Sequence, residues 1–168
     1  IEQIEETAKQ LVDAQYDAYF ALASYTNNTD GRTAKNAEQF KSYFLDLDCG
    51  LGKPYADQSE GLTALKKFIK DTALPKPTIV NSGRGVHAYW VLDQAIDRDT
   101  WKPLAERLKA LCEKHKLHAD PAVTADAARI LRIPGTFNFK NLENPQPVQV
   151  LMAAAPVLNS VFEALEAP

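Results

Sequence analysis

The spacing of apolar residues along the chain changes several times between a helical and a strand period. Over residues 1–16 the apolar side chains recur every three to four positions, which predicts an amphipathic helix. Elsewhere, short apolar or alternating runs bounded by glycine, proline and asparagine are typical of strands. Strands are expected over residues 19–25, 42–48, 77–81, 86–92, 129–134 and 147–152, and further helices over about 57–74, 100–116 and 157–165.

Local signals place several boundaries of these elements. Asp57 followed by Glu60 resembles a capping box at the start of a helix, and Thr100 is expected to cap the next helix. Gly83 and Gly85 predict a tight turn that joins two strands. The alternation of strands and helices predicts an α/β or α+β sheet protein.

Composition limits the class of protein. The chain has 168 residues, of which 45% are hydrophobic and 24% charged, as expected for one globular domain spanning residues 1–168. No apolar run approaches the ~20 residues of a membrane-spanning helix, and the acidic first residues do not resemble a signal peptide, so a cytoplasmic protein is expected. The missing initiator methionine suggests a fragment of a longer protein.

Charge and cysteine content narrow the candidate ligands. The net charge is −3, which argues against a protein that coats duplex DNA by neutralising many phosphates. Cys49 and Cys112 are the two cysteines; both are expected to be reduced, and they are too few for a disulfide framework. No Cys/His cluster has the spacing of zinc ligands, so zinc is not expected.

The first candidate for chemistry is the pair Asp46 and Asp48 at the end of the strand predicted over residues 42–48. Residues two apart on a strand point to the same face, with Cα atoms roughly 6.5–7 Å apart, so these carboxylates can share divalent ions. Oxygen ligands completed by substrate phosphates suit Mg²⁺ or Mn²⁺. The alternative is an ordinary loop cap or surface pair, although unpaired carboxylates would be costly on a strand this apolar.

The second candidate is the segment from Ser82 to His87. Its glycines, Gly83 and Gly85, permit a phosphate to approach the backbone, Arg84 adds a charged fork, and His87 can donate to a phosphate oxygen. The alternative is a plain hairpin turn followed by a core histidine.

The third candidate is the segment over residues 120–140. It begins with Asp120, a further carboxylate that could bind metal, and continues into an apolar stretch that contains three cations. A triphosphate could partner these cations, which are Arg129, Arg132 and Lys140. In the alternative interpretation, the arginines form structural ion pairs with Asp120 and Asp126.

Taken in order, these three segments resemble the three motifs of the archaeo-eukaryotic primase superfamily, in the form seen in phage and plasmid replication primases and primase-polymerases. The first motif, Asp-x-Asp, is matched by Asp46 and Asp48, and the second, small-x-His, by Gly85 to His87. Ser82 lies outside the strict second motif. The third, a hydrophobic residue followed by Asp, is matched by Ala119–Asp120, with Asp126 as a rival because it also follows an alanine.

The resemblance covers about residues 18–152 and implies a catalytic core with a mixed sheet like that of an RNA-recognition motif, packed with helices, plus an N-terminal α/β unit. It implies that Asp46, Asp48 and Asp120 bind two Mg²⁺ or Mn²⁺ ions, and that His87 holds the phosphates of the incoming nucleotide. The implied reaction is attack of a 3′-hydroxyl on an α-phosphate with release of pyrophosphate. The candidate nucleotide contacts are Ser82, Arg84, Gly85, His87, Arg129, Arg132 and Lys140.

The partners implied by the resemblance are a single-stranded DNA template and nucleoside triphosphates, with a helicase or a helical accessory domain in the full-length protein. The setting would be the cytoplasm of a bacterium or a phage-infected host cell. Two rival functions are a non-catalytic single-stranded DNA-binding replication-initiator domain with the same fold, and a phosphatase of the haloacid-dehalogenase type. The latter also places Asp-x-Asp at a strand end, but Cys49 and Gly50 match its pattern poorly.

Overall fold

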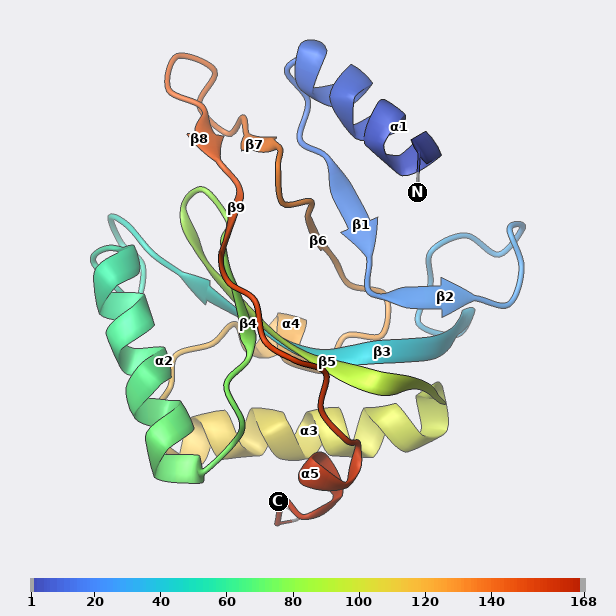
Figure 1. Cartoon of the computed structure of the whole chain (residues 1–168), viewed down its shortest axis with the longest axis vertical. Helices are drawn as coiled ribbons and strands as arrows, with labels where there is room; N and C mark the ends of the chain where they lie inside the picture. The colour runs from blue at the N-terminus through green and yellow to red at the C-terminus, as the bar shows by residue number, and fades with distance from the viewer. Residues whose placement is uncertain (1, 167–168) are drawn as a thin grey trace.

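A computed structural model, which describes residues 2–166, shows a five-stranded antiparallel sheet at the centre of the molecule (Figure 1). The order of its strands is β2-β3-β5-β4-β9, and every neighbouring pair runs antiparallel. The longest strands, β3 and β5, lie side by side in the middle. The bounds of the strands are β2 Ala23–Tyr25, β3 Ala37–Asp48, β4 Thr78–Asn81, β5 Gly85–Asp97 and β9 Gln149–Met152.

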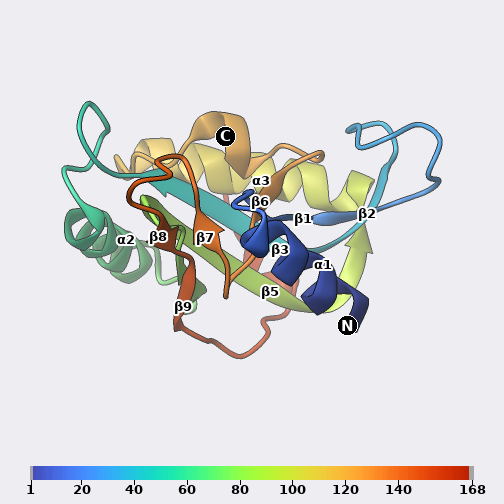
Figure 2. The same cartoon turned by 90° about the horizontal axis from the view of Figure 1, so that it is seen from above.

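Two short antiparallel strand pairs lie apart from the central sheet. One joins β1 (Tyr19–Ala21) to β6 (Ile130–Arg132), and the other joins β7 (Phe137–Asn138) to β8 (Gln146–Pro147). Figures 1 and 2 show both pairs on the side of the sheet that also carries the first helix, α1 (Glu2–Asp13). They therefore cover the sheet face opposite to that occupied by the long helix.

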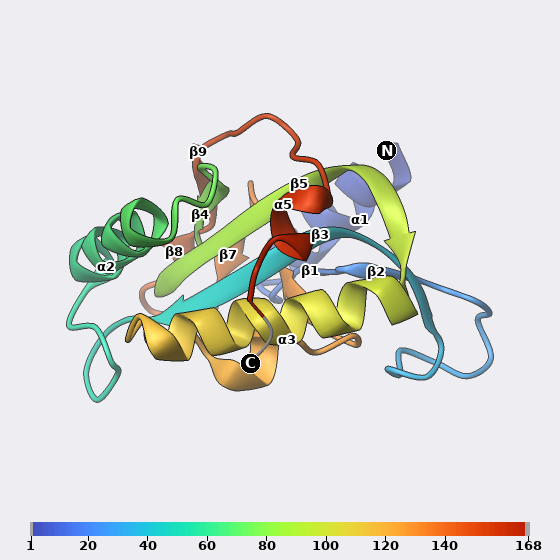
Figure 3. The same ribbon diagram turned by 90° about the horizontal axis from the view of Figure 1, so that it is seen from below.

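The long helix α3 (Arg98–Lys114) runs along the other face of β3 and β5, next to the short helix α5 (Ser160–Glu163), as Figure 3 shows. Trp101 of α3 is fully buried, stacks on Phe40 at 4.0 Å between ring centroids, and donates its indole N–H to the Ser42 carbonyl at 3.0 Å. Tyr43 stacks on Phe162 of α5 at 4.0 Å. This aromatic layer fixes β3 against the helices and leaves its other face for chemistry.

Two further helices flank the sheet. Helix α2 (Gln58–Thr72) begins at Asp57, whose side chain accepts from the Glu60 N–H at 2.9 Å, while the Glu60 carboxylate accepts from the Ala56 N–H at 2.6 Å. The predicted cap is therefore confirmed, with the return bond shifted by one residue. The single-turn helix α4 (Pro121–Thr124) packs against β3. Within residues 2–166, none of the helices has the length and apolarity needed to cross a bilayer.

Several predicted elements differ from the structure. The central sheet is antiparallel throughout, and not mixed. Strands β2 and β3 are consecutive neighbours, as are β4 and β5, whereas the connections from β3 to β4 and from β5 to β9 each skip one strand, so strands that run in the same direction never lie next to each other. The strand predicted over residues 19–25 is two strands in different sheets, divided at Leu22. Asp97, and not Thr100, caps α3: its carboxylate accepts from the Thr100 N–H at 2.7 Å, so the cap lies three residues before the predicted one and the helix begins at Arg98. The helix predicted over residues 157–165 is confined to α5.

Candidate active site

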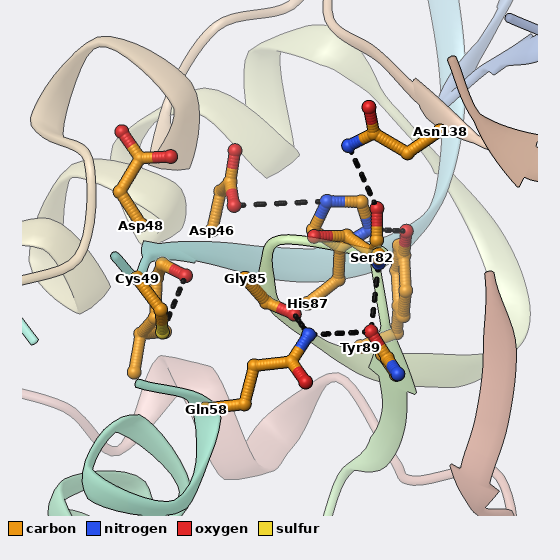
Figure 4. A network of polar contacts seen from close by, with 12 residues as sticks. Asp46, Asp48, Cys49, Gln58, Ser82, Gly85, His87, Tyr89 and Asn138 are labelled. Atoms are coloured by element: carbon orange, nitrogen blue, oxygen red, sulfur yellow. Dashed lines mark hydrogen bonds and ion pairs between the residues drawn. The ribbon is translucent and has the colours of Figure 1, made fainter. Parts of the chain in front are cut away.

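The register between β3 and β5 brings the first two sequence motifs together. Asp46 lies directly opposite His87, and Asp48 opposite Gly85. Directly paired residues project on the same face of an antiparallel sheet, so the carboxylates and the imidazole share one surface. The Nε2 atom of His87 lies 3.6 Å from Oδ1 of Asp46, as Figure 4 shows.

A cavity of about 740 Å³, here called the site cavity, opens over these residues. Eight of the residues predicted from the sequence line it: Asp46, Asp48, Ser82, Arg84, Gly85, His87, Arg132 and Lys140. Carboxylates therefore lie at one end of a concavity whose other walls carry cations and glycine backbone. Such a distribution suits a ligand that is itself anionic and is bridged to the carboxylates by cations.

Close backbone contacts explain the two glycines in the β4–β5 turn. A Cβ at Gly83, where φ is +90°, would lie 2.6 Å from Cβ of Asn138, and a Cβ at Gly85 would lie 2.5 Å from the Leu47 carbonyl oxygen. Side chains outside the turn hold it in place. Gln58 donates to the Asn81 side chain at 2.5 Å and to the Gly85 carbonyl at 3.1 Å (Figure 4).

Burial and like charge disturb the protonation of the central pair. Burial, followed by the nearby carboxylates of Asp48 and Asp120, raises the pKa of Asp46 to about 7. Burial, followed by the nearby cation Arg132, lowers the pKa of His87 to about 3, so its imidazole is neutral at physiological pH. The ionised form of Asp46 is thus disfavoured near neutral pH, and the adjacent neutral histidine does not offset this.

The buried Tyr89 fixes the other side of the His87 ring, since its hydroxyl lies 3.0 Å from Nδ1. Burial raises the pKa of this phenol, which therefore keeps its proton as a donor. A proton on Tyr89 that points to Nδ1 leaves the imidazole proton on Nε2, the nitrogen nearer Asp46 and the site cavity.

The third motif is attached to the first through the backbone. Strand β2 pairs only with the first half of β3, and the Asp120 N–H donates to the Asp46 carbonyl at 2.8 Å on the edge left free. Asp120 lines a smaller adjoining cavity with Asp48, while its carboxylate caps α4 by accepting from the Ala122 N–H at 2.8 Å. The rival Asp126 pairs with Arg129 at 3.0 Å and lines a separate cavity. Position thus favours Asp120.

The candidate cations divide into two groups. Arg129 pairs with Asp126 and donates to the Ala122 carbonyl at 2.9 Å, and it does not line the site cavity; for this residue the structural ion pair is the arrangement found. Arg84, Arg132 and Lys140 do line it. Among the described residues, the Nε atoms of all three candidate arginines, Arg84, Arg129 and Arg132, are buried without a hydrogen-bond partner, so the lining of the site cavity is what separates the two groups.

The acidic end of the cavity is only partly arranged for a metal. Among residues 2–166 no three His, Cys, Asp or Glu side chains converge as a formed metal site. Lys53 donates to Asp48 at 2.7 Å, so a lysine ammonium lies at one carboxylate. Asp46 and Asp48 nevertheless fit Mg²⁺ or Mn²⁺, since such ions are often held by one or two carboxylates together with substrate phosphates.

Several residues of this site were not predicted from the sequence: Lys53, Gln58, Tyr89, Asn138 and Gln146. Gln58 follows the predicted cap Asp57 directly, so its position at a helix start was visible, although its partners were not. Asn138 donates to the Ser82 carbonyl at 3.3 Å across a long sequence separation, and no local pattern indicates such a contact.

Comparisons with known proteins bear on the fold. The sequence matches no protein-family model. It is 28% identical over 113 residues to a replication protein of Clostridium perfringens, an alignment that covers 66% of this chain and 27% of that protein's length. The chain therefore spans about a quarter of this curated relative.

Two solved structures resemble the chain over nearly its whole length. The AEP domain of the cyanophage S-2L primase-polymerase superposes with a TM-score of 0.71 and 18% identity, covering 96% of this chain and 76% of that one. The primase RepB′ superposes with a TM-score of 0.50 and 14% identity, covering 95% and 61%. The motifs that resemble those of primases thus lie on the matching architecture, and the chain has the fold of the archaeo-eukaryotic primase superfamily.

Proposed function

We propose that this chain is the catalytic domain of a replication primase or primase-polymerase, which transfers nucleotides from NTP or dNTP to a 3′-hydroxyl on a single-stranded DNA template. One observation carries the proposal: Asp46 and Asp48 face His87 and the glycine turn across two paired strands, within one cavity also lined by Arg84, Arg132 and Lys140. The primase fold and the resemblance to a replication protein support it.

Asp46 and Asp48 would hold Mg²⁺ or Mn²⁺, with Asp120 as the third carboxylate. Divalent ions bound there would activate the attacking hydroxyl and stabilise the leaving pyrophosphate. Burial, followed by the nearby carboxylates of Asp48 and Asp120, raises the pKa of Asp46, and bound divalent cations would favour its ionised form and relieve the repulsion among the carboxylates. The Asp120 carboxylate would have to turn away from the Ala122 N–H to join them.

The opposite wall would bind the triphosphate. His87 is neutral, and its Nδ1 lies beside the Tyr89 hydroxyl, so with that hydroxyl as donor Nε2 would donate to a phosphate oxygen. Arg84 and Arg132 would supply charge-assisted hydrogen bonds, and Lys140 a further positive charge. The narrow Gly83–Gly85 turn would allow phosphates to approach the backbone. These residues would orient the α-phosphate toward the carboxylates, which is the main task of a protein in phosphoryl transfer.

The rival functions predict different behaviour. A phosphatase of the haloacid-dehalogenase type is not retained, because the chain has the primase fold. A DNA-binding module without catalysis would share that fold, yet it would not require two carboxylates facing a histidine over an open cavity. A helicase or helical accessory domain in the full-length protein stays a prediction.

Primer extension tests the proposal. Purified protein with Mn²⁺ or Mg²⁺ should extend a primer on a single-stranded template, and Asp46→Ala with Asp48→Ala should abolish extension. Mn²⁺ should also raise the melting temperature of the wild type, because a ligand that binds only the folded state stabilises it, and this shift should vanish in the double variant.

A matched control is Asp13→Ala with Asp71→Ala, which removes two carboxylates from exposed helix ion pairs. It should retain extension. Full activity in the Asp46/Asp48 variant would refute the proposal. A wild type that binds single-stranded DNA but neither binds nucleotide nor extends primers would favour the DNA-binding module.

A further inference from the structure

Arg132 is held by a carboxylate that lies outside all three motifs. Its Nη2 atom donates to Oδ2 of Asp17 at 2.7 Å, and the two side chains are largely buried, with 19% and 23% of their surface exposed. The guanidinium also lies over the ring of Tyr19, 5.1 Å from its centroid. A half-buried ion pair with a stacked face restrains an arginine far more than an exposed pair does.

The fold explains why these residues meet. In the β1–β6 pair, Tyr19 lies directly opposite Arg132, and the Ile133 N–H donates to the Ala18 carbonyl at 3.0 Å. Asp17 is two residues before Tyr19, so the two side chains share a face and Asp17 reaches Arg132 diagonally. The Tyr19 hydroxyl then donates to Asp17 at 2.9 Å.

The same carboxylate ties down the segment that carries Lys140. Oδ1 of Asp17 accepts from the Phe139 N–H at 2.7 Å, directly before Lys140 in the chain. Both Arg132 and Lys140 line the site cavity. One aspartate thus connects the strand of one cavity cation to the backbone next to another, with each carboxylate oxygen bound to a different element.

We propose that Asp17 is a positioning residue for the nucleotide triphosphate: it orients the guanidinium of Arg132, and fixes the backbone beside Lys140, so that both cations face the phosphates. This inference rests on the proposed function. Asp17 takes up one amino group of the guanidinium, and the other donors of this side chain, which lines the site cavity, remain to bind a phosphate oxygen. Pre-orientation of this kind reduces the entropy lost when the ligand binds.

The test compares nucleotide affinity in a double-mutant cycle, with a fluorescent NTP analogue and Mn²⁺ as the probe. Asp17→Asn cannot accept from both Arg132 and Phe139, and should weaken binding about tenfold, the size expected for a charged hydrogen bond. Arg132→Ala should weaken it at least as much. The nucleotide affinity of the double variant should lie within about twofold of that of Arg132→Ala, since Asp17 acts mainly through Arg132.

A kinetic measurement separates a role of Asp17 in positioning the nucleotide from a general loss of folded structure. In primer extension, Asp17→Asn should raise KM for the nucleotide and leave kcat within about twofold, because a phosphate contact made equally in the ground and transition states affects binding alone. Affinity for single-stranded DNA should not change. Asp13→Asn, which removes an exposed carboxylate paired with Lys9, is the matched control and should behave as wild type.

Three results would overturn the inference: wild-type nucleotide affinity in Asp17→Asn, fully additive losses in the double variant, or a fall in kcat with no change in KM. If Asp17→Asn does not fold, Asp17→Glu serves instead, because its displaced carboxylate cannot satisfy both donors; unchanged affinity in that variant would equally overturn it. If the wild type binds no nucleotide, both the proposed function and this inference are refuted. If the wild type binds nucleotide and the Asp17 variant binds it with the same affinity, only the inference is refuted.

Discussion

The turn that borders the site cavity contains Gly83. A comparison of Gly83 with Gly135 separates the cost of backbone strain at a positive φ from the cost of a steric clash. Both residues have a φ of +90°, a conformation that favours glycine. A Cβ at Gly83 would lie 2.6 Å from Cβ of Asn138 and 3.0 Å from the Gln146 carbonyl oxygen, whereas a Cβ at Gly135 would meet nothing within 4 Å. Alanine at Gly135 therefore meets strain alone, and alanine at Gly83 meets strain and a clash.

The expected losses follow from these contacts. Strain at a positive φ costs roughly 1–2 kcal/mol in each variant. Overpacking adds roughly 1–3 kcal/mol at Gly83 only, because the obstructing atoms include backbone and the root of a side chain, which cannot move aside easily. Gly83→Ala should thus be less stable than Gly135→Ala by about 1–3 kcal/mol, equivalent to a melting temperature lower by roughly 2–12 °C for a chain of this size.

Urea unfolding followed by circular dichroism measures both free energies of unfolding, and nucleotide binding gives a second readout. Gly83→Ala should also weaken nucleotide binding, since displacement of Asn138 and Gln146 disturbs two residues that line the site cavity, while Gly135→Ala should not. Equal losses of stability in the two variants would refute the steric reasoning, and unchanged nucleotide affinity in Gly83→Ala would show that the turn does not shape the cavity.

Three further predictions concern stability. Trp101→Ala removes a fully buried ring stacked at 4.0 Å on Phe40, and should lower the free energy of unfolding by about 3–5 kcal/mol; a loss below about 1 kcal/mol in urea titration would contradict the packing described. Asp97→Ala should lower the melting temperature more than Thr100→Ala, because Asp97 is the cap of α3. A larger decrease in Thr100→Ala would instead indicate that Thr100 is the cap. Burial raises the pKa of Asp17, but hydrogen bonds from Arg132, Phe139 and Tyr19 outweigh it, and the net pKa is lowered. The stabilisation from Asp17 is therefore complete above its unfolded pKa of about 3.9 and is lost as the pH falls through the lower folded value. The free energy of unfolding should accordingly fall more steeply with pH below about pH 4 in the wild type than in Asp17→Asn. Parallel curves for the two proteins would show that the ion pair does not contribute.

The parts of the site that could be predicted from the sequence are those fixed by local geometry. Strand periodicity alone places Asp46 and Asp48 on one face, and the Asp57–Glu60 spacing indicates the start of α2. The cap at Thr100 was wrong for a local reason too: β5 passes into α3 without a loop, so Asp97 both ends the strand and caps the helix. A pattern that assumes a connecting loop places such a boundary too late.

Contacts between distant segments bear on alternatives that the sequence left open. Asp120 and Asp126 each follow an alanine, and what distinguishes them by position is the bond from the Asp120 N–H to the Asp46 carbonyl, together with the different cavities that they line. Arg129 and Arg132 looked equivalent, yet one pairs with Asp126 three residues away, and the other with Asp17 across 115 residues. An ion pair between near neighbours can form wherever the segment lies, whereas the pair of Arg132 with Asp17 forms only once the sheet has folded. Local sequence therefore could not indicate that Arg132, and not Arg129, lines the site cavity.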